Sequence, residues 1–406
     1  MALKAVIMAA GMSTRAYPLT LTRPKPLLKA ANKTILQHNL EQLQETGLFD
    51  EFVIVVGYKA EMIQQAFGKE FMGIRITYAK QKEQLGSGDA LLAAKPFLKK
   101  EFLVMNGDDL YFAEDIIRMV NERYAVLSKK VKDPERYGVY VVASGYAKML
   151  VEKPKEFISN TANIGCYKLD MKVFDFEKEI EESERGEMEI TDFISELMKK
   201  EKVKVIEAER WCPIAYAWDL LAANELMLKD IKKEIKGEIE ANVTMKGEVI
   251  VGEGTVVKSG VYIEGPVAIG KNCAIGPNAY LRASTSIGDN CKIGHEVEIK
   301  NSIIFDNSAV PHLSYIGDSV IGENVNIGAG SVTANLRHDK GIIRTSMKKD
   351  IEGEVKEDII ETGLHKFGTI IGDNAKIGIK TIIYPGRKIW PGMSTLPGQK
   401  VDADVE

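Results

Sequence analysis

Hydrophobic residues follow two patterns along the 406-residue chain, and the pattern changes near Gly237. Before this point, short apolar runs alternate with segments of helical spacing. The runs predict strands that are buried on both faces of a sheet, because they are continuous and β-branched: KAVIMAA, EFVIVVG, IRITYA and EFLVMNGDD. Helices are expected between them, over Ile35–Thr46 and Ala60–Phe67, which gives βαβ units and a largely parallel sheet.

After Gly237 the apolar residues recur every six positions. Twelve of them keep one register: Ile239, Met245, Val251, Val257, Ile263, Ile269, Ile275, Leu281, Ile287, Ile293, Ile299 and Phe305. Neither a helix nor an ordinary strand has this period, but a coil with three short faces does, since each face points one apolar side chain inward and the corners favour Gly, Asn and Asp. The pattern predicts a left-handed parallel β-helix of hexapeptide repeats.

The six-residue register is interrupted twice. It shifts after Phe305, resumes over Tyr315, Ile321 and Ile327, and breaks again through the charged segment 336–366 before it returns at Ile371. A charged insertion of this length inside a regular coil is expected to be functional or to form an arm. The chain is thus expected to fold as an α/β Rossmann-like domain over residues 1–235, including a linker helix, followed by a β-helix over 236–406.

Composition limits the kinds of partner. The 54 basic and 58 acidic residues give a net charge of −4, too balanced to indicate a nucleic acid or a membrane surface. The four cysteines are widely spread, without spacing typical of a zinc site, and are expected to be buried thiols in a reducing compartment. No uncharged apolar run reaches about 18 residues. A soluble, cytoplasmic protein that acts on small molecules is expected.

The first apolar run leads into the stretch VIMAAGMSTRAYPLTLTRPKPLL. Ala9, Ala10 and Gly11 are small enough for backbone N–H groups to approach a triphosphate, and Arg15 and Lys25 add positive charge. In an open parallel sheet, ligands bind beyond the carboxyl ends of the strands, where this stretch falls. A tight turn with two surface cations would have the same sequence, so both interpretations stay open on these residues alone.

The stretch resembles the signature of sugar-1-phosphate nucleotidylyltransferases. Seven further motifs follow in the order of that family: QLGSGDA (84–90), NGDD (106–109), YGVY (137–140), VEKP (151–154), NIGCY (163–167), EITD (189–192) and AWDLL (217–221). The resemblance implies in-line attack by a sugar-phosphate oxygen on the α-phosphorus of a nucleotide, with release of pyrophosphate. Such a reaction needs positioning and charge neutralisation rather than a covalent nucleophile.

The resemblance also implies roles for single residues. Arg15 and Lys25 would be catalytic, and Asp108 and Asp219 would bind Mg²⁺. The other implied contacts are Ala9, Ala10, Gly11, Gln81, Gly86 and Ser87 for the nucleotide, Gly138, Glu152 and Asn163 for the sugar, and Lys153 for its phosphate. The stretch QKEQLGSGDA is most similar to uridylyltransferases and favours UTP, whereas Asp219 matches thymidylyltransferases and leaves dTTP open.

A second resemblance begins at one of only five histidines. The run HLSYIGDSVIGENVNIGAGSVTAN, from His312 to Asn335, is similar to the acetyltransferase domain of the bifunctional N-acetylglucosamine-1-phosphate uridylyltransferase/glucosamine-1-phosphate acetyltransferase family. In that family the histidine is the general base, and an Arg and a Lys lie 30 and 12 residues before it, which are Arg282 and Lys300 here. Imidazole titrates near neutrality and suits this role. Without this context, a histidine in a turn is usually a solvated corner residue.

The second resemblance implies a set of contacts with glucosamine-1-phosphate and acetyl-CoA. Arg282 and Lys300 would bind the phosphate, Tyr315 and Asn326 the sugar, and the Ala329 backbone and Asn335 the coenzyme. Apart from the resemblance, the lysine-rich segment 336–366 would add Lys340 or Lys366 for the coenzyme phosphates. Two residues depart from the family pattern in the coenzyme pocket, Leu336 in place of Tyr and Ile379 in place of Ser.

Two other functions remain open at this point. One is a single-activity mannose-1-phosphate or glucose-1-phosphate nucleotidylyltransferase with a structural or regulatory β-helix, and the other is a regulatory subunit that senses sugar nucleotides. His312 with Arg282, Lys300 and Asn335 argues for acetyl transfer, because a scaffold does not need these side chains. Galactosamine-1-phosphate is an open alternative to glucosamine-1-phosphate. A homotrimer is expected, since three coils packed in parallel bury their exposed faces.

Overall fold

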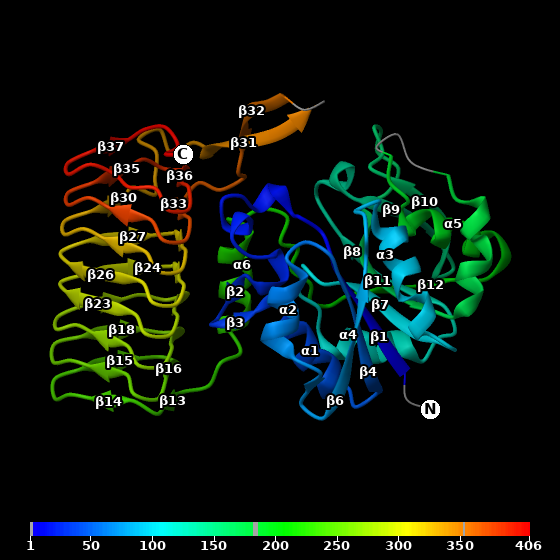
Figure 1. Cartoon of the computed structure of the whole chain (residues 1–406), viewed down its shortest axis with the longest axis horizontal. Helices are drawn as coiled ribbons and strands as arrows, with labels where there is room; N and C mark the ends of the chain where they lie inside the picture. Colours follow the sequence, from blue (N-terminus) through cyan, green and yellow to red (C-terminus); the bar gives the residue numbers. More distant parts are fainter. Residues whose placement is uncertain (1–2, 182–185, 352–353) are drawn as a thin grey trace. The chain divides into compact units, whose positions relative to one another are not determined.

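The computed structural model describes residues 3–181, 186–351 and 354–406, which form two compact units (Figure 1). The first unit comprises the described residues up to Met12, Pro24–Leu27 and Ile35–Pro213. The second comprises Ser13–Arg23, Leu28–Thr34 and the described residues from Ile214 to the end. The expected domain boundary at residues 235 and 236 stays a prediction.

A mixed sheet of ten strands forms the centre of the first unit. Its order is β5 (Glu70–Phe71), β6 (Ile74–Lys80), β4 (Phe49–Val56), β1 (Leu3–Ala9), β7 (Phe102–Asn106), β11 (Thr161–Leu169), β8 (Ala125–Lys130), β12 (Lys204–Glu207), β10 (Tyr146–Glu152) and β9 (Gly138–Ala143). Strands β6, β4, β1 and β7 are parallel neighbours, and β11 pairs antiparallel with β7 and β8. The four apolar runs of the first half are thus confirmed as adjacent parallel strands.

Helices cover both faces of this sheet. The chain contains α1 (Ile35–Glu45), α2 (Ala60–Phe67), α3 (Ser87–Ala94), α4 (Ala113–Val120), α5 (Ile190–Lys200) and, in the second unit, α6 (Asp219–Leu228). Along β1, Val6 packs into one core with α3 and α5, whereas Ile7 packs into the other with α1, α2 and α4. This two-sided burial explains why the strand sequences are apolar without alternation. No helix in the described parts of the chain is long and apolar enough to cross a membrane.

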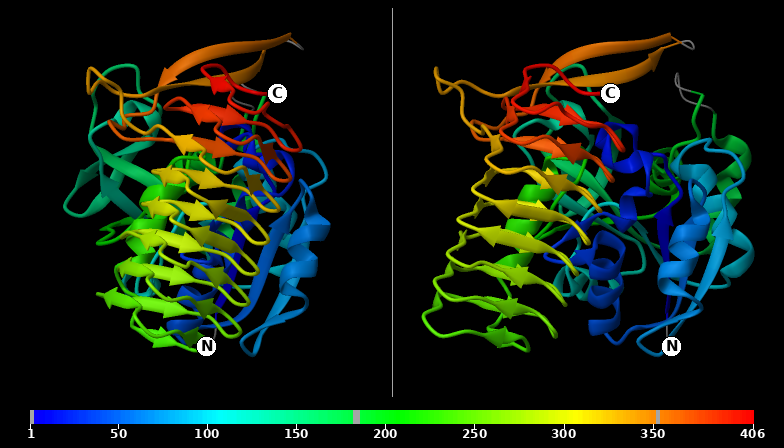
Figure 2. Two further views of the ribbon diagram at one scale, coloured as in Figure 1. Left: turned by 90° about the vertical axis from the view of Figure 1, so that its left-hand side faces the viewer. Right: turned by 60° about the vertical axis from the view of Figure 1, so that its left-hand side comes forward.

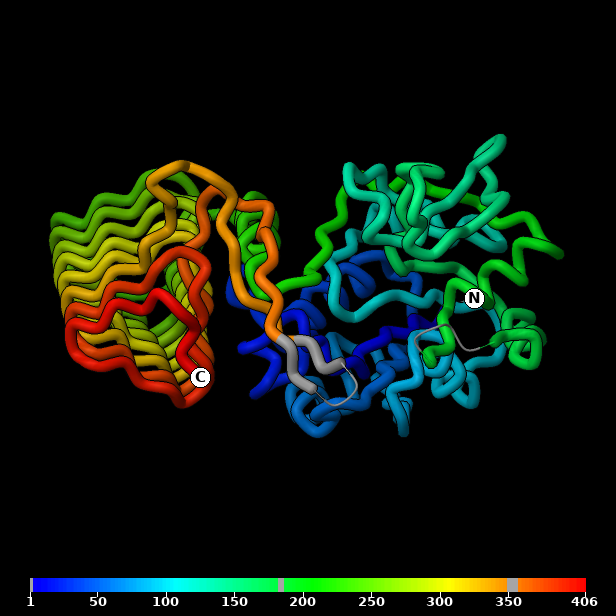
Figure 3. The backbone as a smooth tube through the Cα atoms, turned by 90° about the horizontal axis from the view of Figure 1, so that it is seen from above, coloured from blue at the N-terminus to red at the C-terminus, as the bar shows by residue number. Residues whose placement is uncertain are grey.

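The second unit is a coil whose strands form three parallel sheets (Figure 2). The first sheet contains β13 (Glu234–Ile235), β16 (Val249–Val251), β19 (Val267–Ile269), β22 (Thr285–Ile287), β25 (Ile303–Ile304), β28 (Val320–Ile321), β33 (Thr369–Ile371) and β36 (Arg387–Ile389). The second contains β14 (Glu238–Ile239), β17 (Val256–Val257), β20 (Ala274–Ile275), β23 (Lys292–His295), β26 (Ala309–His312), β29 (Asn326–Ile327) and β34 (Lys376–Ile377). The third contains β15 (Thr244–Lys246), β18 (Tyr262–Glu264), β21 (Tyr280–Leu281), β24 (Glu298–Lys300), β27 (Tyr315–Gly317), β30 (Val332–Thr333), β35 (Ile382–Ile383) and β37 (Lys400–Val401). Figure 3 views these coils from one end.

The six-residue register is confirmed up to Ile299 but wrong at Phe305 and Tyr315. Ile287 pairs with Ile304, and Ile299 pairs with Ile316. Ile304 and Ile316 therefore continue the inward row, by which we mean the apolar side chains that point into the coil. The physical reason is that the corners after Ile299 and after Ile316 are one residue shorter. The next residue that points into the coil therefore comes one position earlier in the sequence. Asparagine occupies corners of the coil, as expected, with positive φ at Asn272, Asn290, Asn307, Asn324 and Asn374.

The charged insertion contains an antiparallel hairpin. Its strands are β31 (Arg344–Ile351) and β32 (Glu354–Glu361). The base of the hairpin is attached to the coil, because Ile343 is fully buried and Thr345 Oγ1 donates a hydrogen bond of 2.7 Å to Gly386 O. The insertion therefore forms an arm, which is one of the two outcomes expected from the sequence.

Candidate active sites

The glycine-containing loop after β1 is fixed from two directions. The carbonyl oxygen of Ala10 accepts hydrogen bonds from the Tyr58 amide at 2.9 Å and from Gln84 Nε2 at 3.1 Å. A Cβ atom at Gly57 would lie 2.9 Å from the same oxygen, so the neighbouring chain approaches too closely for a side chain. Gln84 was not singled out from the sequence, although it opens the QLGSGDA motif.

Lys25 and Asp108 form an ion pair in the first unit. Their Nζ and Oδ2 atoms are 2.8 Å apart, and the lysine side chain is 5% exposed whereas the aspartate is 35% exposed. Gly107, just before the aspartate, donates a backbone hydrogen bond of 2.8 Å to Met8 O, which brings the NGDD loop to the carboxyl end of β1. One predicted catalytic cation and one predicted metal ligand therefore meet where a parallel sheet binds its ligand.

Arg15 and Asp219 belong to the second unit. Arg15 is exposed in a single turn of 3-10 helix over Thr14–Ala16. Asp219 is the first residue of α6, and its Oδ2 accepts backbone hydrogen bonds from Ala215 at 2.9 Å and Tyr216 at 2.7 Å. The carboxylate thus organises the turn before the helix, and its role as a metal ligand with Asp108 stays a prediction.

The residues predicted to face the base also support their own loop. Gln81 Nε2 donates hydrogen bonds to Gly86 O at 3.0 Å and to Asp89 Oδ2 at 2.9 Å. Ser87 Oγ accepts a hydrogen bond of 3.0 Å from the Ile190 amide at the start of α5. Gly86 has a φ of 104°, where a side chain would be strained. Their contact with a base stays a prediction.

The predicted sugar-binding residues lie together. Gly138 pairs with Glu152 across β9 and β10, and a Cβ atom at Gly138 would be 2.8 Å from Glu152 Oε2 and 3.7 Å from Asn163 Cβ. Asn163 Nδ2 donates a hydrogen bond of 2.8 Å to the Tyr167 hydroxyl. Lys153 Nζ lies 3.7 Å from Glu152 Oε1. Three polar side chains thus gather beside Gly138, where a larger residue would displace the Glu152 carboxylate.

A buried carboxylate, Asp318, connects the predicted acetyl-transfer residues of the coil. Its side chain is 4% exposed and lies 3.1 Å from Lys300 Nζ. It also accepts hydrogen bonds from Asn335 Nδ2 and from Asn301 Nδ2, the latter at 2.7 Å. Asn335 Nδ2 lies within 3.1 Å of the Tyr315 hydroxyl as well. Three predicted residues from successive coils therefore share one network.

Arg282 is held by a second carboxylate that the sequence did not single out. Its Nη1 lies 2.9 Å from Glu298 Oε1. Glu298 pairs with Tyr315 in the next coil, so the arginine and the Asp318 network share one sheet of the coil. Burial raises the pKa of the Tyr315 hydroxyl, which therefore stays protonated at neutral pH. Both missed carboxylates lie close to residues that the sequence did single out: Glu298 is two residues before Lys300, and Asp318 lies within the run that begins at His312.

His312 lies exposed at a corner of the coil. It ends β26, pairs with His295 of the preceding coil, and its carbonyl accepts a hydrogen bond of 3.3 Å from the Gly330 amide of the next coil. Asn326 pairs with Ala309, at the other end of β26. At about 3.3 Å per residue, His312 and Asn326 are roughly 10 Å apart along the sheet. One chain does not bring these two predicted residues together.

The predicted coenzyme residues lie where the chain leaves the coil for the arm. The Ala329 carbonyl accepts a hydrogen bond of 2.8 Å from the Lys380 amide, which connects it to the coil that carries Ile379. Ile379 is 53% exposed and Leu336 is 44% exposed. Lys340 is exposed at the start of the arm. The two departures from the family pattern thus present apolar surface to solvent, where the family has hydroxyl groups.

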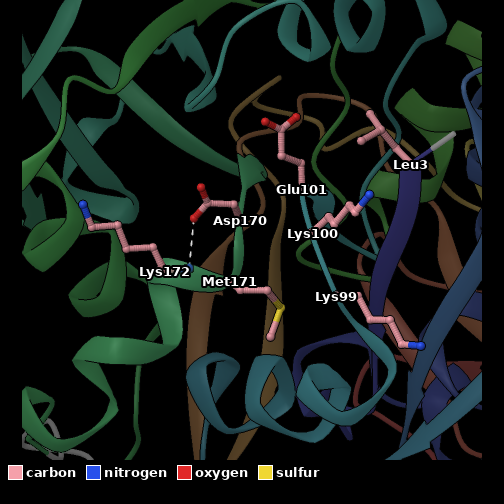
Figure 4. A pocket seen from close by; sticks show the side chains of 7 residues that line it. All are labelled: Leu3, Lys99, Lys100, Glu101, Asp170, Met171 and Lys172. Carbon is pink, nitrogen blue, oxygen red and sulfur yellow. Dashed lines mark hydrogen bonds between the residues drawn. The ribbon is translucent and has the colours of Figure 1, made fainter. Parts of the chain in front are cut away.

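A pocket away from these residues opens at the amino ends of β1 and β7 (Figure 4). It is lined by Leu3, Lys99, Lys100, Glu101, Asp170, Met171 and Lys172. Because β1 and β7 are parallel, this pocket and the Ala9–Gly11 loop lie at opposite edges of the sheet. It is therefore separate from the candidate nucleotide site.

The described residues fit a Mg²⁺ ion that keeps several waters better than a metal ion held only by protein side chains. In the described residues, no group of three or more His, Cys, Asp or Glu side chains could hold a metal ion. Mg²⁺ usually keeps several waters and binds one or two carboxylates with substrate phosphates. Asp108 is partly exposed and meets that requirement as a single oxygen donor.

Both halves of the chain match models of known protein families. Residues 4–230 match the family model described as nucleotidyl transferase, and residues 263–392 match the model described as GMPPB C-terminal domain. A crystal structure from Bacillus anthracis described as a glucose-1-phosphate thymidylyltransferase has a TM-score of 0.52, is 29% identical, and covers 57% of this chain and 98% of its own. The first half therefore has the fold of a nucleotidyl transferase.

Full-length relatives extend the match to both halves. A protein of Methanocaldococcus jannaschii named bifunctional protein GlmU is 42% identical over 99% of this chain and 95% of its own. A protein of Sulfurisphaera tokodaii named bifunctional sugar-1-phosphate nucleotidylyltransferase/acetyltransferase is 39% identical over 99% of this chain and 98% of its own. The chain belongs to this family of bifunctional sugar-1-phosphate nucleotidylyltransferase/acetyltransferases. The predicted enzyme class is confirmed, and the single-activity and regulatory alternatives are not favoured.

Proposed function

We propose that the protein makes UDP-N-acetylglucosamine in two steps. It first transfers an acetyl group from acetyl-CoA to the amine of glucosamine-1-phosphate. It then transfers a uridylyl group from UTP to the acetylated sugar phosphate and releases pyrophosphate. Galactosamine-1-phosphate and dTTP are the alternative substrates that the sequence leaves open.

In nucleotidyl transfer, the residues of this chain position phosphates and neutralise their charge. Lys25 and Arg15 bind the phosphates and stabilise charge on the α-phosphorus during in-line attack. Asp108 and Asp219 would hold Mg²⁺, and the bound ion would neutralise negative charge on the phosphates. The loop with Gln81, Gly86 and Ser87 receives the base. The buried position of Lys25 supports its role, because a desolvated ammonium binds an anion more strongly than an exposed one.

In acetyl transfer, His312 accepts the proton that the sugar amine loses as its nitrogen attacks the thioester carbonyl. The C–S bond then breaks, and the coenzyme leaves as a thiolate that takes up a proton. Lys300 and Arg282 bind the sugar phosphate, and Tyr315 and Asn326 bind its hydroxyls. The observation that carries this proposal is the network that joins Lys300, Asn335 and Tyr315 through the buried Asp318. A coil does not need that network for its own packing.

A homotrimer is part of the proposal. His312 and Asn326 lie at opposite ends of neighbouring strands within one chain. Neighbouring subunits packed side by side would bring the histidine of one coil to the asparagine of another. We expect light scattering to give three times the chain mass, and an active monomer in the acetyl reaction would contradict this. The left hand of the coil and a cytoplasmic location also stay predictions.

The direct test is mass analysis of the products formed from glucosamine-1-phosphate, acetyl-CoA, UTP and Mg²⁺. The proposal predicts N-acetylglucosamine-1-phosphate first and UDP-N-acetylglucosamine later. Parallel reactions with galactosamine-1-phosphate and dTTP define the substrate range. A product that carries the nucleotide without the acetyl group would contradict the order of the steps, and the absence of acetylated product would contradict the second activity.

A further inference from the structure

A line of acidic residues marks one corner of the coil. Asp289, Asp306, Glu323 and Asp373 each lie two residues after a strand of the first coil sheet. The Oδ1 atoms of the three aspartates accept backbone hydrogen bonds from the coil before: Asp289 from Lys271 N at 2.7 Å, Asp306 from Asp289 N at 2.9 Å and Asp373 from Glu323 N at 2.7 Å. We call these four residues the acidic corner. In each of these aspartates, one carboxylate oxygen connects adjacent coils, and the second carboxylate oxygen can accept from a side chain outside the acidic corner.

Arg23 binds two members of the acidic corner within the second unit. Its Nη2 lies 2.5 Å from Asp373 Oδ2 and 2.6 Å from Glu323 Oε2, and the arginine side chain is only 11% exposed. Thr22 Oγ1 donates a further hydrogen bond of 2.6 Å to Asp373 Oδ2, and the guanidinium lies 5.4 Å from the Phe305 ring centre. Because its charge is already paired with two carboxylates, Arg23 is not itself available to a substrate phosphate.

Further contacts fix the neighbouring segment 28–34. Lys29 forms an ion pair with Asp306, a third member of the acidic corner. Asn32 Nδ2 donates a hydrogen bond of 2.8 Å to Ile287 O, and the Ala31 amide donates one of 2.7 Å to the Asn224 side chain of α6. The segments before and after Lys25 are therefore both attached to the coil, and the second is also attached to α6.

The first of these segments carries Arg15 in a compact turn. Ser13 O accepts hydrogen bonds from the Ala16 amide at 3.0 Å and from Thr20 Oγ1 at 2.9 Å. The turn with Arg15 thus continues through Thr20 to the anchored Arg23. We propose that Arg23 is a positioning residue for nucleotidyl transfer, which acts by fixing this segment, and with it Arg15, on the acidic corner of the coil. This inference rests on the proposed nucleotidyl transfer.

A buried, well-hydrogen-bonded ion pair suits this task. Removing one partner leaves an uncompensated buried charge, so the segment is expected to leave its position when Arg23 or Asp373 is replaced. A displacement of about 1 Å in a group that stabilises the transition state costs roughly 10²-fold in rate. The loss is expected in kcat, because Arg15 acts on charge that develops at the α-phosphorus.

The test measures both activities of the full-length protein for Arg23→Met, Arg23→Lys and Asp373→Asn. We expect Arg23→Met and Asp373→Asn to lower nucleotidyl-transfer kcat by roughly 10- to 100-fold, with N-acetylglucosamine-1-phosphate as substrate. Arg23→Lys keeps the charge and is expected to recover part of the rate. Acetyl transfer should change by less than about twofold, because none of its predicted residues is altered. Lys236→Gln is the matched control, because it breaks an exposed ion pair of 2.7 Å with Glu234 on the same coil.

The double variant Arg23→Met/Asp373→Asn separates positioning from stability. It removes both buried charges, so the unfolding temperature should recover towards that of the wild type while nucleotidyl transfer stays low. The inference would be overturned if the double variant recovered its nucleotidyl-transfer rate together with its stability. A wild-type kcat in a folded Arg23→Met or Asp373→Asn protein would also overturn it, and neither result would affect the proposed function. A wild-type protein that transfers acetyl but not nucleotidyl groups would instead overturn the proposed function, and the inference with it.

Discussion

Asp318 illustrates how a single buried charge organises residues from separate coils. The Lys300 ammonium and the Asn335 amide both approach its carboxylate, although they lie 18 and 17 positions away in the sequence. Hydrogen bonds to a charged group contribute about 1.5–3 kcal/mol each, so this carboxylate fixes the predicted phosphate and coenzyme contacts more firmly than a neutral group would.

We expect Asp318→Asn to lower kcat/KM of acetyl transfer by roughly 10- to 100-fold, mainly through the KM for glucosamine-1-phosphate. The amide cannot accept from three donors as the carboxylate does, so Lys300 loses its fixed position. Steady-state kinetics of both reactions measures this, with nucleotidyl transfer unchanged. Asp402→Asn, at an exposed aspartate of the same coil, is the control. An unchanged KM in the folded Asp318 variant would refute this role.

Lys388 provides a pH-dependent test of burial. It is 4% exposed on β36, and burial lowers the pKa of its ammonium to about 8. In the unfolded chain a lysine titrates near ~10.4, so between these values the unfolded state holds a proton that the folded state has lost. The free energy of unfolding should therefore rise with pH across this window through this group.

Urea unfolding at pH 7.5 and at pH 9.5, followed by circular dichroism, measures this effect. The wild type should gain more stability between the two pH values than Lys388→Met, which has no group to titrate there. Equal changes in the two proteins would contradict the burial of a titrating lysine at this position.

At the scale of elements, much of the fold was predictable from apolar spacing. The four parallel strands and the helices α1 and α2 were expected, because continuous apolar runs and helical spacing are local signals. The inward row could not be followed past Ile299, since the sequence offers two adjacent large residues, Ile304 beside Phe305 and Tyr315 beside Ile316. A corner that is one residue shorter decides between them, and only the pairing of the coils shows which corner is short.

The acetyl-transfer site was likewise only partly predictable from local sequence patterns. Motifs located His312, Lys300 and Asn335, but Asp318 and Glu298 were missed. Their importance comes from hydrogen bonds between stacked coils, which no local pattern reports.

The corrected register predicts which isoleucine the coil core needs. Ile316→Ala should lower the free energy of unfolding by about 2–5 kcal/mol, because it leaves a cavity in the inward row. Ile382→Ala, at a side chain that is 39% exposed, should cost less than about 1 kcal/mol. Urea unfolding of the two variants compares them, and equal costs would show that Ile316 does not point inward.

In the whole molecule, the two proposed reactions use residues that do not overlap. Nucleotidyl transfer depends on phosphate-binding cations and a metal, whereas acetyl transfer depends on a base and a thioester. Acetylated sugar phosphate is the product of one reaction and the substrate of the other. Supplying it directly therefore bypasses His312 and isolates the metal-dependent step.

The most direct measurement follows both products for His312→Ala and Asp108→Asn by mass spectrometry, with glucosamine-1-phosphate and with N-acetylglucosamine-1-phosphate. We predict that His312→Ala lowers acetyl-transfer kcat by roughly 10²- to 10⁴-fold and leaves uridylyl transfer from the acetylated substrate unchanged. Asp108→Asn should accumulate N-acetylglucosamine-1-phosphate without the nucleotide sugar. Loss of both activities in either folded variant, or acetylation by His312→Ala near the wild-type rate, would contradict two independent sites.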